Sequence, residues 1–546
     1  MKRKSLVLPF LGALLAALVF LPAASSSQNA TSRQLNCDAN GPLCAEPAEV
    51  FNYESGYIGH DEPSLLFYSS SPGSGNSTTY HMSLPVEPPT LPTQAGTGGT
   101  DTFQDRIAFW FGMALCEDQS GPNPGGSALA GPNNPCTPDS DSNIYTSTDT
   151  ADPNYIGKHP GVGFLELQFY PPGWVKWPPG VSCDPSKWCA AMALFQLNLN
   201  QNSGIANNED CLDTVGVEPA NFAFVTRSGK PVGPPDPLGQ TQATFTPSPS
   251  KVLMMHQGDS LTVDIHDTAA GLTAIIHDLT SGQSGSMTAS VANGFATVNY
   301  DPAASQCSET PHAWHPAYST SSEDTRVIWA AHTYNVAFSD EIGHFEYCNA
   351  VTGPGGDCTS PGVGDSTLDG DDSYCFGSPF QGPFAAKIKV GGCLSTDNDF
   401  DGVSYQTTWP GTFSNPSQDA ALHPTSVLFT SPLFNGTQNY NRVAFEADLP
   451  RIEAADFGGN CNRSTGAGCA NPPPGSNFYP FYSTGAAGQC VWQLGGPYIP
   501  GTTNTFGGSS AAEFGPLLFS VYPTSAGPIS RTNNFRQILG SNPCPA

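Results

Sequence analysis

The stretch between Lys251 and Asp301 constrains the fold more than any other part of the chain, because its residues alternate as they do in successive antiparallel strands. Across Ser260–Asp267 the apolar residues Leu261, Val263 and Ile265 alternate with polar ones. A period of two is typical of a strand with one buried face. We therefore predict a half-buried strand here, with the three apolar side chains toward the core.

The same pattern continues after a glycine-containing turn. Leu272–Asp278 places Leu272, Ala274 and Ile276 on one face of a second strand. Two further strands are predicted over Ser286–Ala292 and Phe295–Tyr300, joined at Asn293 and Gly294. An Asn-Gly pair tolerates positive φ and suits a two-residue type I′ hairpin. The meander indicates an all-β fold.

Composition agrees with this fold class. The 546 residues include 58 glycines and 52 prolines, about a fifth of the chain, and helix-length periodic runs are few. Such turn-rich chains are typical of β-sandwiches with many loops. We predict a jelly-roll β-sandwich with a second, smaller β domain and long Gly/Pro-rich loops. The expected division is 1–25 signal peptide, 26–100 extended lead-in, 101–394 main sandwich and 395–546 C-terminal β domain.

The N-terminus predicts export. A short basic run, MKRK, precedes the apolar stretch Leu6–Ala24, which is the pattern of a secretory signal peptide with cleavage expected between Ala24 and Ala30. The alternative is an uncleaved anchor, since the apolar run approaches the length that spans a membrane. We expect a secreted, extracellular protein with no membrane association after cleavage.

Charge excludes one class of partner. Removal of the three basic residues of the MKRK run leaves 16 basic residues against 47 acidic ones, a net charge of about −31. Nucleic acids and anionic membranes are bound by clustered Lys and Arg. We therefore expect neither as a partner.

Cysteine usage agrees with export. All 16 cysteines follow the signal peptide, and an even number in an exported chain predicts disulfides. Short spacings suggest local pairs Cys37–Cys44, Cys183–Cys189 and Cys461–Cys469, and Cys116 with Cys136 could close a long loop.

The first candidate site lies on Gly163–Tyr170 and the loop after it. Glu166, Gln168 and Tyr170 fall on one face of a predicted strand, as acid, amide and phenol groups do on the concave face of a glycan-binding sandwich. Trp174 and Trp177 follow on a proline-stiffened loop, and flat indoles stack on sugar rings. The alternative is a solvent-facing polar strand with the tryptophans packed in the core.

This strand resembles the acidic strand of concanavalin-like glycosidases. Their fuller E-x-D-x-x-E spacing is absent, since Gln168 occupies the position of the Asp. The resemblance implies a concanavalin-like sandwich that acts on glycans, and the departure argues against a retaining mechanism on this strand.

The second candidate site is the segment Ser339–Cys348 together with the upstream run PHAWHP. Glu341, His344 and Glu346 could share a face if the segment is extended, and the upstream run adds Trp314 between His312 and His315. A carboxylate bonded to an imidazole can act as general acid or base, and the same groups can bind zinc or copper. Alternatively, His344 and Glu346 satisfy each other structurally.

The third candidate is a calcium loop. Asp397, Asp399 and Asp401 alternate and precede a glycine, which is how a short loop wraps Ca²⁺. The twelfth position of this loop is Thr408 rather than the bidentate Glu of an EF-hand. The alternative is an acidic, well-solvated turn.

Taken together, these patterns predict a secreted protein that binds or acts on extracellular polysaccharide. If it is an enzyme, we expect a glycoside hydrolase with Glu166 or Glu346 as general acid, Glu341 as its partner, and Tyr170 among the residues that position the sugar. Two alternatives stay open: a non-catalytic, calcium-stabilised surface or adhesion protein, and an acid-active glutamic peptidase that uses Gln168 with a glutamate.

Overall fold

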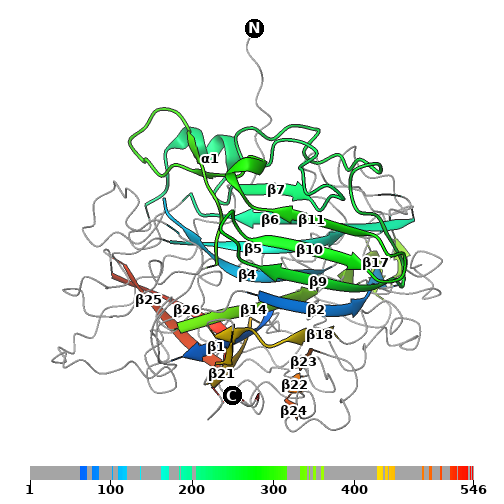
Figure 1. Ribbon diagram of the computed structural model, residues 1–546. Helices are drawn as coiled ribbons and strands as arrows, with labels where there is room; N and C mark the ends of the chain where they lie inside the picture. The colour runs from blue at the N-terminus through cyan, green and yellow to red at the C-terminus, as the bar shows by residue number, and fades with distance from the viewer. Residues whose placement is uncertain are drawn as a thin grey trace, which may run out of the picture.

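The computed structural model describes residues 205–316 without a gap, together with strands and short flanking pieces between residues 62 and 198 and between 332 and 544. The described residues are mostly β-strand, and every strand pairing among them is antiparallel. An all-β fold class is therefore confirmed for this part of the chain (Figure 1).

The largest sheet has ten strands, and β5 lies toward one end of it. Its order is β25 (Leu517–Thr524), β26 (Gly527–Ile538), β21 (Arg442–Asp448), β1 (Glu62–Ser69), β14 (His332–Asp340), β4 (Phe109–Glu117), β5 (Gly161–Tyr170), β6 (Lys187–Phe195) and β7 (Ala220–Phe224), with β8 (Met255–His256) paired to β6.

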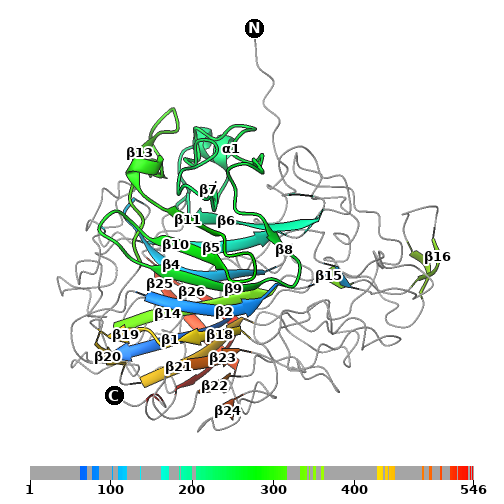
Figure 2. The same cartoon turned by 45° about the vertical axis from the view of Figure 1, so that its right-hand side comes forward.

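The second sheet has eight strands and contains most of the predicted meander. Its order is β11 (Ser284–Thr288), β10 (Thr273–Asp278), β9 (Ser260–His266), β2 (Ser77–Ser83), β18 (Val427–Thr430), β23 (Val491–Leu494), β22 (Tyr482–Thr484) and β24 (Thr505–Phe506). Both views show β9–β11 layered over β4–β6 (Figure 1, Figure 2).

Four short pairs lie outside these sheets. They are β12 (Ala296–Val298) with β13 (Glu309–Pro311), β3 (Asp101–Thr102) with β15 (Gly343–His344), β16 (Cys348–Val351) with β17 (Cys358–Pro361), and β19 (Leu433–Phe434) with β20 (Gln438–Asn439).

The two large sheets bury their inner faces against each other. One apolar cluster takes Leu165, Leu167 and Phe169 from β5 and Leu261, Val263 and Ile265 from β9, all at most 1% exposed. Buried aliphatic and aromatic side chains each stabilise the fold by roughly 1.5–3 kcal/mol. The predicted inward faces of the meander and of Gly163–Tyr170 are therefore confirmed.

The prediction of a two-residue hairpin turn at Asn293 and Gly294 is wrong. Val291–Asn293 form a 3-10 turn, and Gly294 follows in the left-handed region with φ of 86°. β12 then pairs with β13 and not with β11. The Asn-Gly pair therefore ends a 3-10 turn and does not form a hairpin turn. The strand after it, β12, pairs with the later strand β13.

Strands from the predicted C-terminal domain join both sheets. β21 pairs with β1 in register Leu65↔Phe445, and β18 pairs with β2 in register Phe429↔Tyr80. Among the described residues, strands from both sides of residue 394 therefore pair within the same sheets.

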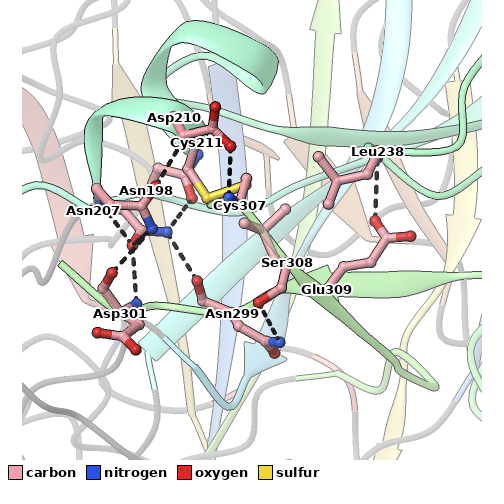
Figure 3. The surroundings of a disulfide bond; sticks show 12 residues. Asn198, Asn207, Asp210, Cys211, Leu238, Asn299, Asp301, Cys307, Ser308 and Glu309 are labelled. Carbon is pink, nitrogen blue, oxygen red and sulfur yellow. Dashed lines mark hydrogen bonds between the residues drawn. A yellow bond between two sulfur atoms is a disulfide. The ribbon is translucent and has the colours of Figure 1, made fainter. Parts of the chain in front are cut away.

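Two disulfides have both cysteines among the described residues. Cys116–Cys136 is the predicted loop closure, whereas Cys211–Cys307 spans 96 residues and was not predicted. Cys211 lies in α1 (Glu209–Val215), whose N-terminus is capped by the Asn208 side chain. Figure 3 shows this disulfide beside the bond from the Cys307 amide to the Asp210 carboxylate, 2.7 Å long.

Candidate functional site

β5 presents the predicted polar row on the outer face of the ten-stranded sheet. Its inner face is apolar and fully buried, and Glu166, Gln168 and Tyr170 alternate with those inner residues. β4 and β6 pair with β5 on either side along its length, which fixes the direction of each side chain.

The three side chains form one chain of hydrogen bonds. The Tyr170 hydroxyl donates to Gln168 Oε1 at 2.6 Å, and Gln168 Nε2 donates to Glu166 Oε2 at 2.6 Å. Both functional ends of the amide are therefore engaged, which fixes its orientation. Short bonds to a carboxylate are charge-assisted and are stronger than bonds between neutral groups.

Exposure differs along the row. Tyr170 is 8% exposed and Gln168 is 3% exposed, whereas Glu166 is half-buried. An open polar row is expected from the sequence, but only the Glu166 end of the row reaches the solvent. Gln168 and Tyr170 consequently orient Glu166, and their burial prevents them from contacting a ligand directly.

The closed end is covered by an apolar cluster on the outer face. The Tyr170 ring lies edge-on to Phe222 and Phe224, with centroids 6.2 and 6.5 Å away. Phe245, from the segment after β7, packs against Phe222 with centroids 5.1 Å apart. The proline-rich segment at residues 229–250 therefore does more than connect two strands, since it helps to cover one end of this face.

Small residues surround the open end. Gly112 of β4 and Ala193 of β6 lie directly opposite Glu166 in the strand register. Trp110 lies opposite Gln168, and its ring meets Phe164 edge-on with centroids 5.4 Å apart. Glu166 is thus flanked by backbone and a methyl group, with a fully buried indole nearby.

Trp314 does not offer a stacking surface in this structure. Its side chain is fully buried in the core between the sheets. A Cβ added to Gly163 would lie 2.6 Å from its ring, so the indole uses the space that this glycine leaves. The indole buries a large apolar area between the two sheets, and this burial stabilises the fold more than exposure of the ring to solvent would.

The segment around Trp314 ties the two sheets together. The Cys116 amide of β4 donates to the His315 carbonyl at 2.8 Å, and the Leu272 amide beside β10 donates to the Trp314 carbonyl at 2.7 Å. His315 Nδ1 lies 2.8 Å from an oxygen of Asp267, and both side chains are buried. This histidine–carboxylate pair is part of the structural connection.

His312 belongs to the same connection. Its Nδ1 lies 3.7 Å from Asp118 Oδ2. Burial lowers the pKa of His312, and the nearby Asp118 carboxylate opposes that shift only in part. Burial therefore favours the neutral form of this imidazole.

The structure describes only a part of the remaining predicted site residues. His344 lies in β15, where its backbone pairs with Asp101, apart from the two large sheets (Figure 2). Glu341, Glu346, Trp174, Trp177, Asp397, Asp399 and Asp401 lie outside the described residues. Their proposed roles stay predictions.

No group of three or more His, Cys, Asp or Glu side chains that could hold a metal ion occurs among the described residues. In this same part of the chain, no helix is long and apolar enough to cross a membrane.

Two perturbed carboxyl groups were not found from the sequence. Burial raises the pKa of Glu218 to about 8. Burial and a hydrogen bond with the Asp236 carboxyl raise the pKa of Glu309 to about 7, although the Leu238 amide donates to Glu309 Oε2 at 3.1 Å. No local motif marks either residue, because both shifts arise from non-local packing.

A comparison with models of known protein families and a search of curated proteins found no match for this chain.

Proposed function

We propose that this chain is an exported protein that binds extracellular polysaccharide on the outer face of the ten-stranded sheet, with Glu166 as the central contact. The observation that carries the proposal is the hydrogen-bonded row from Tyr170 through Gln168 to Glu166, which ends in a half-buried, oriented carboxylate.

An oriented carboxylate is well suited to sugars. Carboxylate oxygens accept hydrogen bonds from neighbouring hydroxyl groups, and hydrogen bonds to a charged group contribute about 1.5–3 kcal/mol each. Because Gln168 already fixes the side chain, binding costs less conformational entropy than at a mobile glutamate. Gly112 and Ala193, directly opposite in the strand register, place no side chain larger than a methyl group beside the carboxylate.

Binding is better supported than hydrolysis. A glycosidase requires two carboxyl groups, about 5–5.5 Å apart for retention or about 6.5–9.5 Å apart for inversion. The next outward position on β5 is Gln168, whose amide cannot serve as an acid. Hydrolysis therefore requires that Glu341 or Glu346 reach Glu166.

A second candidate function, acid-active glutamic peptidase, is favoured by one contact. Gln168 Nε2 and Glu166 Oε2 are neighbours at 2.6 Å on a sheet face, and such enzymes use a glutamine with a glutamate. The burial of Gln168 weighs against it, since a peptide must reach both groups. Casein cleavage at acid pH that is abolished by Gln168→Ala would select this function.

Other features belong to the same proposal. We infer that the sandwich has jelly-roll connectivity and that the chain is secreted. The disulfides fit an oxidising compartment. Calcium bound at Asp397, Asp399 and Asp401 would stabilise the C-terminal region, as the surface-protein alternative also requires.

The test compares binding by the mature protein and two charge-matched variants. Glu166→Gln removes the proposed contact, and Glu209→Gln removes an exposed carboxylate in the first turn of α1. Each protein is titrated against a panel of neutral, uronate-containing and amino-sugar polysaccharides, with and without EDTA. Reducing ends are assayed in the same samples.

We expect Glu166→Gln to weaken binding by about tenfold or more, equivalent to about 1.4 kcal/mol, and Glu209→Gln to leave it unchanged. If wild type releases reducing ends and Glu166→Gln does not, the protein hydrolyses the polymer and does not only bind it. Equal binding by wild type and Glu166→Gln, or no binding to any polymer, would refute the proposal.

A further inference from the structure

A second group of polar side chains lies on the outer face of the eight-stranded sheet, away from Glu166. Asp264 of β9, His277 of β10 and Ser284 of β11 come from three adjacent strands (Figure 1). They alternate with buried residues of those strands, so all three point outward.

The three side chains are arranged in series. Ser284 lies directly opposite His277 in the register, and its Oγ is 2.7 Å from His277 Nδ1. The other ring nitrogen, Nε2, lies 3.7 Å from Asp264 Oδ2. A hydroxyl bonded to an imidazole that faces a carboxylate is the arrangement by which proteins activate a serine nucleophile.

The carboxylate is itself held in position. Thr79 of β2 lies opposite Asp264 in the register, and its hydroxyl donates to Asp264 Oδ1 at 2.5 Å. This bond leaves Oδ2 directed toward His277. The order of hydroxyl, imidazole, carboxylate and supporting hydroxyl therefore extends across four strands.

The group is accessible from the solvent. The side chain of His277 is 45% exposed, that of Asp264 is 30% exposed, and Ser284 is exposed. β11 is also the edge strand of its sheet. A substrate can therefore approach Ser284 from above the sheet.

The edge also supplies a hydrogen-bond donor. The Ser286 amide points away from β10 and donates to the Thr226 carbonyl at 2.8 Å. Ser284 is two residues earlier on the same strand, so its amide N–H points off the same edge. A backbone N–H beside the nucleophile is the kind of donor that stabilises the oxyanion formed in acyl transfer.

We propose that Ser284, His277 and Asp264 form a nucleophilic site that cleaves acyl esters. Ser284 Oγ bonds to the carbonyl carbon of the ester while its proton moves to His277 Nδ1, and Nε2–H faces Asp264. The bond from the acyl carbon to the alcohol oxygen then breaks, and the alcohol leaves with the proton from Nδ1.

Water completes the reaction. Its oxygen bonds to the acyl carbon and its proton moves to Nδ1. Ser284 Oγ leaves the acyl group and takes that proton back, so the products are the carboxylic acid and free Ser284. The open face suits a small acyl group, such as acetyl, on a soluble or polymeric alcohol.

The test uses a fluorophosphonate probe and p-nitrophenyl acetate with the full mature protein. Ser284→Ala, His277→Gln and Asp264→Asn remove the three groups in turn. Ser286→Ala is the matched control, because Ser286 is an outward-facing serine two residues further along β11. Mass mapping of the labelled peptide locates the modified residue.

We expect the probe to label Ser284, and Ser284→Ala to abolish both labelling and ester hydrolysis. His277→Gln should slow both by about 100-fold or more, the usual contribution of a general base. Ser286→Ala should match wild type. Absence of labelling, labelling that persists in Ser284→Ala, or rates unaffected by His277→Gln would overturn the proposal.

Discussion

The substitution Tyr170→Phe tests how the polar row on β5 works. It removes the hydroxyl that donates to Gln168 Oε1 at 2.6 Å but keeps the ring that packs against Phe222 and Phe224. Because Gln168 is 3% exposed, water cannot easily replace the lost donor. An unsatisfied buried acceptor costs about 1–3 kcal/mol, so we expect the free energy of unfolding to fall by that amount.

The same substitution should also weaken ligand binding at Glu166. Without the Tyr170 hydroxyl, the Gln168 amide can rotate away from Glu166. The hydrogen bond that orients Glu166 is then weakened, and such a bond contributes about 0.5–1.5 kcal/mol. We therefore expect polysaccharide binding to weaken by about two- to tenfold. Urea unfolding measures the first effect, and titration of the folded protein with polysaccharide measures the second.

Tyr300→Phe is the control. Tyr300 is also buried, and its hydroxyl donates to the Ile205 carbonyl at 2.8 Å, away from β5. This variant should lose less stability, because Ile205 is 39% exposed and water can replace the lost donor, and binding should not change. This role of the Tyr170 hydroxyl would be refuted if Tyr170→Phe bound polysaccharide as tightly as wild type, or if Tyr300→Phe weakened binding equally.

Three further predictions concern stability. Replacing both Cys211 and Cys307 by Ser should cost about 4–5 kcal/mol, because their disulfide closes a loop of about 100 residues; denaturant unfolding checks this. Gly163→Ala should cost about 1–3 kcal/mol and lower the melting temperature, since the new Cβ would lie 2.6 Å from the Trp314 ring. Burial raises the pKa of Glu218 from its ordinary value of about 4.5 to about 8, so its stabilising contribution is full below about pH 4.5 and is lost as the pH rises through 8. Glu218→Gln should flatten this decline, as melting temperatures measured across that pH range would show.

Much of the fold could be predicted because alternation is a local signal. The inward faces of β5, β9 and β10 follow directly from residues that repeat every second position. The turn after Val291–Asn293 was mispredicted because a turn sequence cannot specify which distant strand the chain pairs with next.

The candidate site was only half predictable for the same reason. The sequence placed Glu166, Gln168 and Tyr170 on one face, which depends only on alternation. It did not indicate that Phe222 and Phe245 would cover the Tyr170 end, because that contact joins segments distant in sequence. Likewise, the composition of PHAWHP is compatible with an exposed Trp314, and only the packing of two sheets places it inside.

The most direct test of the central claim is carbodiimide labelling of carboxyl groups with and without saturating polysaccharide, read by mass spectrometry of the peptides. We expect labelling of Glu166 to fall several-fold when the polymer is bound, while labelling of the exposed Glu209 is unchanged. Equal labelling of Glu166 in the free and bound protein would contradict it.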